Sequence, residues 1–348
     1  MRPGQGFETS GRTNGSACAN GVLARRISDL NLKLEGTRIE QLIQRLHGEL
    51  ETAGIGLKPK VYLSDEWGCP NGTPIIGIPF YLADERLTRI EDEMREGVEA
   101  ESDEEILRYL RHEAGHAFNY AYKLYETDAW QELFGPFSRP YRDDYTPSPF
   151  SHNFVRYLPG WYAQKHPDED FAETFAVWLT PQSNWREAYK TWGCYAKLLY
   201  VDEAVKKLGR SEPLVSAEGY NTREESLLSS LAEHYDRLRD PDIEIPPYID
   251  SALRDIFNAP PATESPSADA PVAAAFVESY RRRIIGCVVY WTGLSDSAVR
   301  ALVRHIIERC ERLNLPCRAD PQAALVELVV LITTLCMNKL HKGDFIGK

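Results

Sequence analysis

The chain has 348 residues, 43% of them hydrophobic, which is enough to bury one sizeable core and a smaller second unit. Its 52 acidic and 40 basic side chains give a net charge of −12. This charge argues against nucleic acid as a partner, because phosphate binding needs clustered Lys and Arg.

Three further features predict the compartment. The seven cysteines form no CxxC pair, which favours free thiols in a reducing environment. Residues 1–28 are rich in polar residues and Gly, contain no apolar segment of a secretory signal, and are predicted to be disordered. The apolar segment Leu328–Met337 is too short to span a bilayer. We therefore expect a soluble cytoplasmic protein that does not bind a membrane.

Two helices and two strands are predicted in the first hundred residues. Thr37–Glu40 has capping-box spacing and predicts a helix that continues to about Thr52. Val61–Leu63 and Pro74–Leu82 are rich in β-branched and aromatic residues and are predicted as strands. A further helix is expected within Leu82–Arg95.

The second predicted strand contains two prolines, Pro74 and Pro79. Proline cannot donate a ladder hydrogen bond, so this strand is better placed at a sheet edge. An open edge can bind an extended peptide by strand addition. A plain β-hairpin that covers the core explains the same pattern equally well.

The next helix carries the most informative motif. Ser102 and Glu105 have capping-box spacing and predict a helix from Asp103 to about Tyr125. Within it, HEAGH places His112 and His116 four residues apart and therefore on one helix face.

Glu113 directly follows His112, within reach of a water on a metal held by the two imidazoles. Two neutral imidazoles and a carboxylate base are what metal-assisted amide hydrolysis needs. The alternative is a helix with two histidines on an ordinary polar face.

A second acidic helix is predicted to begin at Pro167, a residue type suited to the first helical position. Glu169 and Glu173 share one face of this largely apolar helix, where two carboxylates repel each other and resist burial. A cation between this face and the HEAGH helix would remove the difficulty. A solvated acidic helix start explains Asp168 and Asp170 better than it explains Glu173. Helix geometry alone leaves Glu169 and Glu173 as alternative third ligands.

HExxH followed by a helix with E-x-x-x-[DE] resembles the gluzincin metallopeptidases, the thermolysin-like clan. The resemblance implies that Glu169 is the third zinc ligand and that Glu173 accepts a hydrogen bond from a ligand histidine. Tyr162 stands seven residues before Glu169, where lethal-factor-type gluzincins carry a tyrosine. The string YAQKHPDEDFAETFAVWL is still more similar to a family of zinc-binding metallopeptidases. The resemblance covers about Trp67 to Leu199 and departs from thermolysin at Asp168, where thermolysin has asparagine.

The resemblance implies one Zn²⁺ per chain, with three protein ligands: His112, His116 and Glu169. Catalytic zinc sites keep their fourth position for water. Glu173 would fix the tautomer of one ligand imidazole, most simply that of His112.

In this interpretation the chain is a zinc-dependent metallopeptidase that hydrolyses a peptide or protein substrate. Glu113 would act as the general base and Tyr162 would donate a hydrogen bond to the developing oxyanion. His152 and His166 are weaker candidates, because His166 flanks a helix start and His152 lies in a Pro/Ser-rich loop.

The expected fold class is α+β, a thermolysin-like gluzincin (zincin) core that is mostly helical, with a small sheet and an edge strand. Further helices are predicted at Trp185–Leu208 and Thr222–Arg239. The predicted organisation is a disordered segment, a metallopeptidase domain, a Pro/Ala/Ser linker and a helical domain, at residues 1–28, 29–258, 259–274 and 275–348.

Three helices are predicted after the linker: Phe276–Trp291, one that begins after Ser295, and Ala323–Lys339. The last is apolar nearly all round and needs to be covered. Residues 275–348 are therefore a candidate surface for a protein partner or for self-association. An alternative function follows, a catalytically silent zinc-binding scaffold that acts through this domain, but such a scaffold has no use for Glu113.

Overall fold

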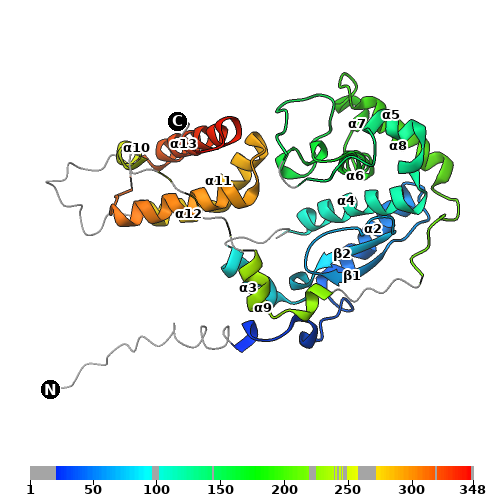
Figure 1. The fold of residues 1–348 in the computed structure, drawn as a ribbon, viewed down its shortest axis with the longest axis horizontal. Coiled ribbons are helices and arrows are strands. Elements are labelled where there is room, and N and C mark those ends of the chain that lie inside the picture. Colours follow the sequence, from blue (N-terminus) through cyan, green and yellow to red (C-terminus); the bar gives the residue numbers. More distant parts are fainter. Residues whose placement is uncertain are drawn as a thin grey trace, which may run out of the picture. The chain divides into compact units, whose positions relative to one another are not determined.

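The computed structural model describes residues 21–95, 102–142, 145–218, 225–238, 240, 243, 245, 249–257, 272–317 and 320–345 (Figure 1). Within these residues the fold is mostly helical with one small sheet, in agreement with the predicted α+β class. The chain divides into two compact units, Met1–Lys123 with Leu208–Arg239, and Leu124–Lys207 with Asp240–Lys348. Most of the predicted disordered segment and of the predicted linker lies outside the described residues, so the domain boundaries stay a prediction.

The first unit contains the HEAGH helix and the sheet. Its elements are the 3-10 helices η1 (Ile27–Leu30), η2 (Phe80–Ala83) and η5 (Glu225–Leu228), the strands β1 (Lys60–Ser64) and β2 (Ile75–Pro79), and the helices α2 (Arg38–Thr52), α3 (Glu85–Arg95), α4 (Asp103–Ala121) and α9 (Leu231–Arg237). The Thr37 side chain accepts a hydrogen bond from the amide of Glu40 and caps α2, as predicted. The helix then buries an apolar stripe that includes Leu42, Leu46 and Leu50.

The sheet differs from the prediction. β1 and β2 pair in parallel, with Lys60 opposite Ile75, so they do not form a hairpin. All five residues of β2 are buried. On its other side, Gly77 exchanges two backbone hydrogen bonds with Gly68, because the turn-rich connection folds back along the strand. The prediction of an open edge for strand addition is therefore wrong at Gly77. The predicted strand Pro74–Leu82 is also shorter in the structure, where β2 ends at Pro79.

The second unit contains the acidic helix and the C-terminal helices. Its elements are η3 (Leu124–Glu126), α5 (Asp128–Phe134), η4 (Pro159–Gln164), α6 (Pro167–Leu179), α7 (Trp185–Ala188), α8 (Tyr195–Leu208), α10 (Ile249–Ile256), α11 (Ala273–Thr292), α12 (Asp296–Arg312) and α13 (Pro321–Lys342). The last residue of α8 falls in the first unit.

Two predicted helices are interrupted. The helix predicted over Trp185–Leu208 breaks before Cys194, whose amide donates to the carbonyl of His152 instead of continuing a helix. A side chain at Gly193 would collide with Asn153, so the loop and this break are closely packed. The helix predicted over 222–239 lies partly outside the described residues, and its described part is η5 followed by α9.

The C-terminal helices form their own apolar core. The buried members include Val277, Ile284, Leu302, Ile306 and Leu328. Helix α11 begins at Ala273, so the end of the predicted linker already belongs to this helix.

These helices also pack against the segment that leads into η4. Gly293 ends α11 with φ +75°, and a Cβ atom there would lie 2.5 Å from Pro147 Cγ and 2.7 Å from Trp161 Cδ1. Gly160 and Trp161 both adopt left-handed backbone conformations, with φ +80° and +59°. For tryptophan this conformation is strained, and surrounding packing must hold it. Arg156 contributes by placing its guanidinium 4.3 Å from the centre of the Trp161 ring system.

Helix α13 is longer than the apolar segment seen in the sequence. It spans 22 residues, and its most apolar 18-residue window has a mean hydropathy of 1.8 with 28% of the window buried. By length and composition alone it is the one described helix that could cross a membrane, and core helices of soluble proteins also meet these criteria. The apolar segment Leu328–Met337 thus lies within a longer helix, and the prediction that the segment is too short to span a bilayer does not extend to the whole helix.

Candidate metal centre

Helix α4 presents the HEAGH residues. It begins with the predicted capping box, in which the Ser102 side chain and the Glu105 side chain each bond the other residue's backbone amide. The two histidines are buried, and their Nε2 atoms lie 3.2 Å apart. Both nitrogens therefore face the same point on one side of the helix.

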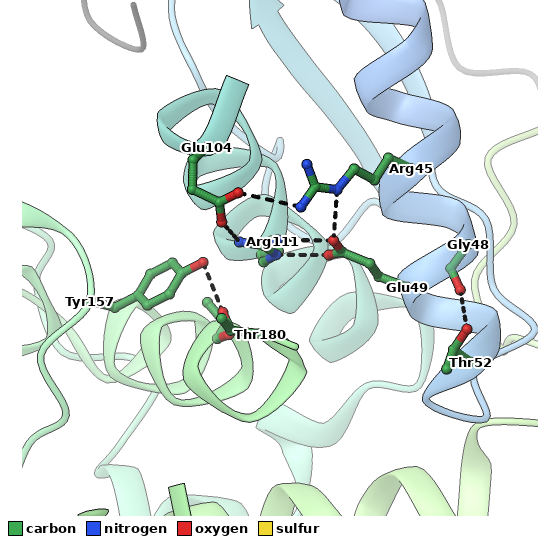
Figure 2. A network of polar contacts seen from close by, with 9 residues as sticks. Arg45, Gly48, Glu49, Thr52, Glu104, Arg111, Tyr157 and Thr180 are labelled. Carbon is green, nitrogen blue, oxygen red and sulfur yellow. Dashed lines mark hydrogen bonds and ion pairs between the residues drawn. The ribbon is translucent and has the colours of Figure 1, made fainter. Parts of the chain in front are cut away.

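Arg111 fixes α4 against α2 (Figure 2). Its guanidinium donates to both carboxylate oxygens of Glu49, at 2.7 and 2.9 Å, and to Glu104 at 2.9 Å. The Arg111 side chain is only 2% exposed and that of Glu49 10%, so the bidentate contact between them is largely desolvated and geometrically specific. Because Arg111 directly precedes His112, the ion pair also restrains the rotation of the histidine face.

Helix α6 begins as the sequence predicts, but its acids are not solvated. Asp168, Glu169, Asp170 and Glu173 are all buried, so the predicted solvated helix start is wrong for Asp168 and Asp170. A buried carboxylate is stable only where hydrogen bonds or opposite charges compensate it.

Lys197 is the polar partner that compensates the burial of Asp170. The Oδ2 atom of Asp170 lies 2.6 Å from Lys197 Nζ, which also donates to the carbonyl of Asn153. Complete burial raises the pKa of Asp170 to about 7, although the Lys197 ammonium opposes this shift.

Glu169 and Glu173 have different partners. Glu169 Oε1 accepts a hydrogen bond of 2.6 Å from the Tyr141 hydroxyl. Glu173 Oε2 accepts one of 2.9 Å from the backbone amide of Leu158, just before η4. The pKa of Tyr145 is raised well above its usual value by burial and by the nearby charges of Glu173 and Glu169.

His112, His116 and Glu169 are brought together. One ring nitrogen of each histidine and one oxygen of Glu169 lie within 4.8 Å of one another, and all three residues are buried. Two ligand nitrogens, each about 2.0–2.1 Å from zinc at a tetrahedral angle, stand about 3.3 Å apart, close to the 3.2 Å between the two Nε2 atoms. Two imidazoles and one carboxylate are also the donor set of known catalytic zinc sites, so the residues fit this metal.

The comparison with protein families bears on whether the HEAGH motif belongs to a metal site. Residues 83–216 match the family described as "Putative zinc-binding metallo-peptidase". The match covers less than half of the chain and includes every candidate site residue named above. It confirms the resemblance to zinc-binding metallopeptidases inferred from the sequence. No curated protein and no solved structure gives a significant match to the chain.

The other predicted site residues lie at several places within the matched residues 83–216. Glu113 is buried on α4 and Tyr162 lies in η4. The His166 side chain accepts a hydrogen bond from the amide of Asp168 and caps α6, in line with its predicted flanking position. His152 stacks on Trp192, with ring centroids 4.3 Å apart.

Tyr141 was missed by the sequence analysis. Its hydroxyl also lies 3.3 Å from that of Tyr162. Neither a motif nor a helical spacing links Tyr141 to Glu169, because 28 residues separate them and Tyr141 stands in an irregular segment.

Proposed function

We propose that this protein is a zinc-dependent metallopeptidase that cleaves peptide bonds. The observation that carries the proposal is the grouping of His112, His116 and Glu169, with buried Glu113 beside His112 on α4. The family match supports the metallopeptidase class independently of this geometry.

Glu113 and Tyr162 have different roles in the proposed reaction. When bound, zinc supplies a water with a pKa lowered to about 7 and polarises the substrate carbonyl. Glu113 takes a proton from the attacking water at its carboxylate and passes it to the leaving amine. Tyr162 donates a hydrogen bond to the carbonyl oxygen as that oxygen gains negative charge.

Glu173 has a supporting role in this proposal. One of its oxygens accepts from the Leu158 amide, which fixes the carboxylate beside the start of η4. The other oxygen would accept a hydrogen bond from the Nδ1 proton of a ligand imidazole, and we assign this imidazole to His112. Such a partner holds the tautomer whose Nε2 atom is free to bind the metal.

The test separates an enzyme from a silent scaffold. Wild type, Glu113→Gln and the control Glu132→Gln are loaded with zinc and incubated with a mixed peptide pool, and products are read by mass spectrometry. Glu132 is exposed on α5, so its variant controls for loss of a carboxylate.

Wild type and Glu132→Gln should bind one zinc and cleave the same peptides. Glu113→Gln should bind zinc equally and lose at least about 100-fold in rate, the usual scale of general-base catalysis. Stoichiometric zinc without cleavage by wild type would favour the scaffold. Full turnover by Glu113→Gln would exclude its role as the base.

A further inference from the structure

Tyr141 is an exposed residue whose hydroxyl reaches a buried carboxylate. The residue is 52% exposed, yet its hydroxyl donates to Glu169 Oε1 at 2.6 Å, and Glu169 is only 5% exposed. A phenol held against a carboxylate at this distance makes a strong, charge-assisted hydrogen bond.

The position of Tyr141 depends on the residue that caps α6. His166 Nδ1 accepts from the Asp168 amide, so the ring proton is on Nε2, which donates to the carbonyl of Arg139 at 2.8 Å. One imidazole therefore ties the start of α6 to the backbone two residues before Tyr141. The His166 ring also packs against the Tyr141 ring, with centroids 5.4 Å apart.

A cation holds Tyr141 from another side. Lys165 Nζ lies 4.4 Å from the centre of the Tyr141 ring and 5.2 Å from that of Tyr162. A positive charge at this range attracts both ring faces and draws electron density from both phenols. It therefore makes their hydroxyls better hydrogen-bond donors.

We propose that Tyr141 is a positioning residue for the metal ligand Glu169. Its hydroxyl holds Oε1 so that the second oxygen of the carboxylate is presented to the metal in a single orientation. This inference rests on the metal site of the proposed function. Partners of this kind typically raise metal affinity, and their loss costs about 10- to 100-fold.

The adjacent Tyr162 provides a matched comparison. Its hydroxyl is 3.3 Å from that of Tyr141, but its proposed contact is with the substrate oxygen. Removal of the Tyr141 hydroxyl should therefore change zinc affinity, and removal of the Tyr162 hydroxyl should change mainly the turnover number. Tyr290, exposed on α11, serves as a control for loss of a phenol hydroxyl elsewhere.

The experiment measures zinc dissociation constants by competition with a chromophoric chelator, without any peptide present. Tyr141→Phe should bind zinc about 10- to 100-fold more weakly than wild type. The zinc dissociation constants of Tyr162→Phe and Tyr290→Phe should stay within about threefold of wild type, because in this proposal neither hydroxyl positions a metal ligand. An unchanged or tighter zinc affinity of Tyr141→Phe would overturn the proposal, because the hydroxyl would then only occupy the place of the ion.

A second measurement excludes a general loss of structure. In a Glu169→Ala background the Tyr141 hydroxyl has no carboxylate to hold, so adding Tyr141→Phe should change the remaining zinc affinity by less than about twofold. An equal loss in both backgrounds would show that Tyr141 acts elsewhere.

Failure of the inference is distinguishable from failure of the proposed function. Zinc binding that depends on Tyr141, without cleavage by wild type, would refute the peptidase and leave the positioning role intact. Absence of zinc binding by wild type would overturn both.

Discussion

Replacing Arg111 by Met tests whether the buried ion pair beside the histidines stabilises the first unit. The side chain is 2% exposed, and its two partners differ in their surroundings: the Glu49 side chain is 10% exposed and the Glu104 side chain 62%. Loss of the guanidinium therefore leaves Glu49 as a buried carboxylate without its bidentate partner, while Glu104 returns to water at little cost.

Breaking a buried pair by removing one partner typically costs about 3–5 kcal/mol of the free energy of unfolding. Arg45 still lies 3.4 Å from Glu49 Oε1 in the variant and offsets part of the loss. We therefore expect the lower end, about 3 kcal/mol. Replacing the exposed Arg45 by Met should cost about 1 kcal/mol or less, as for surface ion pairs.

The assay is urea denaturation followed by far-ultraviolet circular dichroism, with chelator present so that zinc does not contribute. The double variant Glu49→Leu with Arg111→Met removes both charges and should recover most of the loss. The reasoning is refuted if Arg111→Met costs less than about 1 kcal/mol, or if the double variant is no more stable than the single one.

Two further predictions concern the second unit. The pKa of Asp170 is raised from its usual 3.8 to about 7, so the folded chain keeps a proton that the unfolded chain loses, and the contribution of this group to stability falls as pH rises from about 4 to about 7. The difference in unfolding free energy between wild type and Asp170→Asn, measured by urea titrations across this range, should therefore decrease with pH; a flat or rising difference would contradict the assignment. Gly293→Ala should cost about 2–4 kcal/mol, from a left-handed backbone and from collisions with Pro147 and Trp161. The control Gly343→Ala has φ +85° and open space at its Cβ position, so thermal or urea unfolding should show a loss of only about 1 kcal/mol, and equal losses would argue against the contact.

The sequence predicted α4 well because its signals are local. The capping box and the four-residue histidine spacing both act within one helix, and they fix its start and the shared face of His112 and His116. Helix periodicity alone left Glu169 and Glu173 as alternative ligands. The resemblance to gluzincins favoured Glu169, and the folded chain groups Glu169 with the two imidazoles.

Contacts between distant segments were beyond sequence reasoning. The bidentate partner of Arg111, Glu49, is 62 residues away, and the partner Tyr141 of Glu169 is 28 residues away. Neither pair has a spacing that a pattern could reveal. The acids at the start of α6 look solvated in sequence, since nothing local shows that Lys197 compensates Asp170 in the interior. The parallel pairing of β1 and β2 was missed because the intervening Gly and Pro residues suggested a hairpin turn.

The tight approach of Gly293 to Trp161 has a consequence for anyone who shortens this chain. The family match ends at residue 216, so a shortened protein that stops before the C-terminal helices would be an obvious choice. Such a protein would lack the Gly293 backbone that packs against Trp161. The backbone of Trp161 is already in an unfavourable conformation, and Tyr162 follows it directly. The C-terminal helices should therefore be retained in any shortened form, because they support the segment that carries Tyr162.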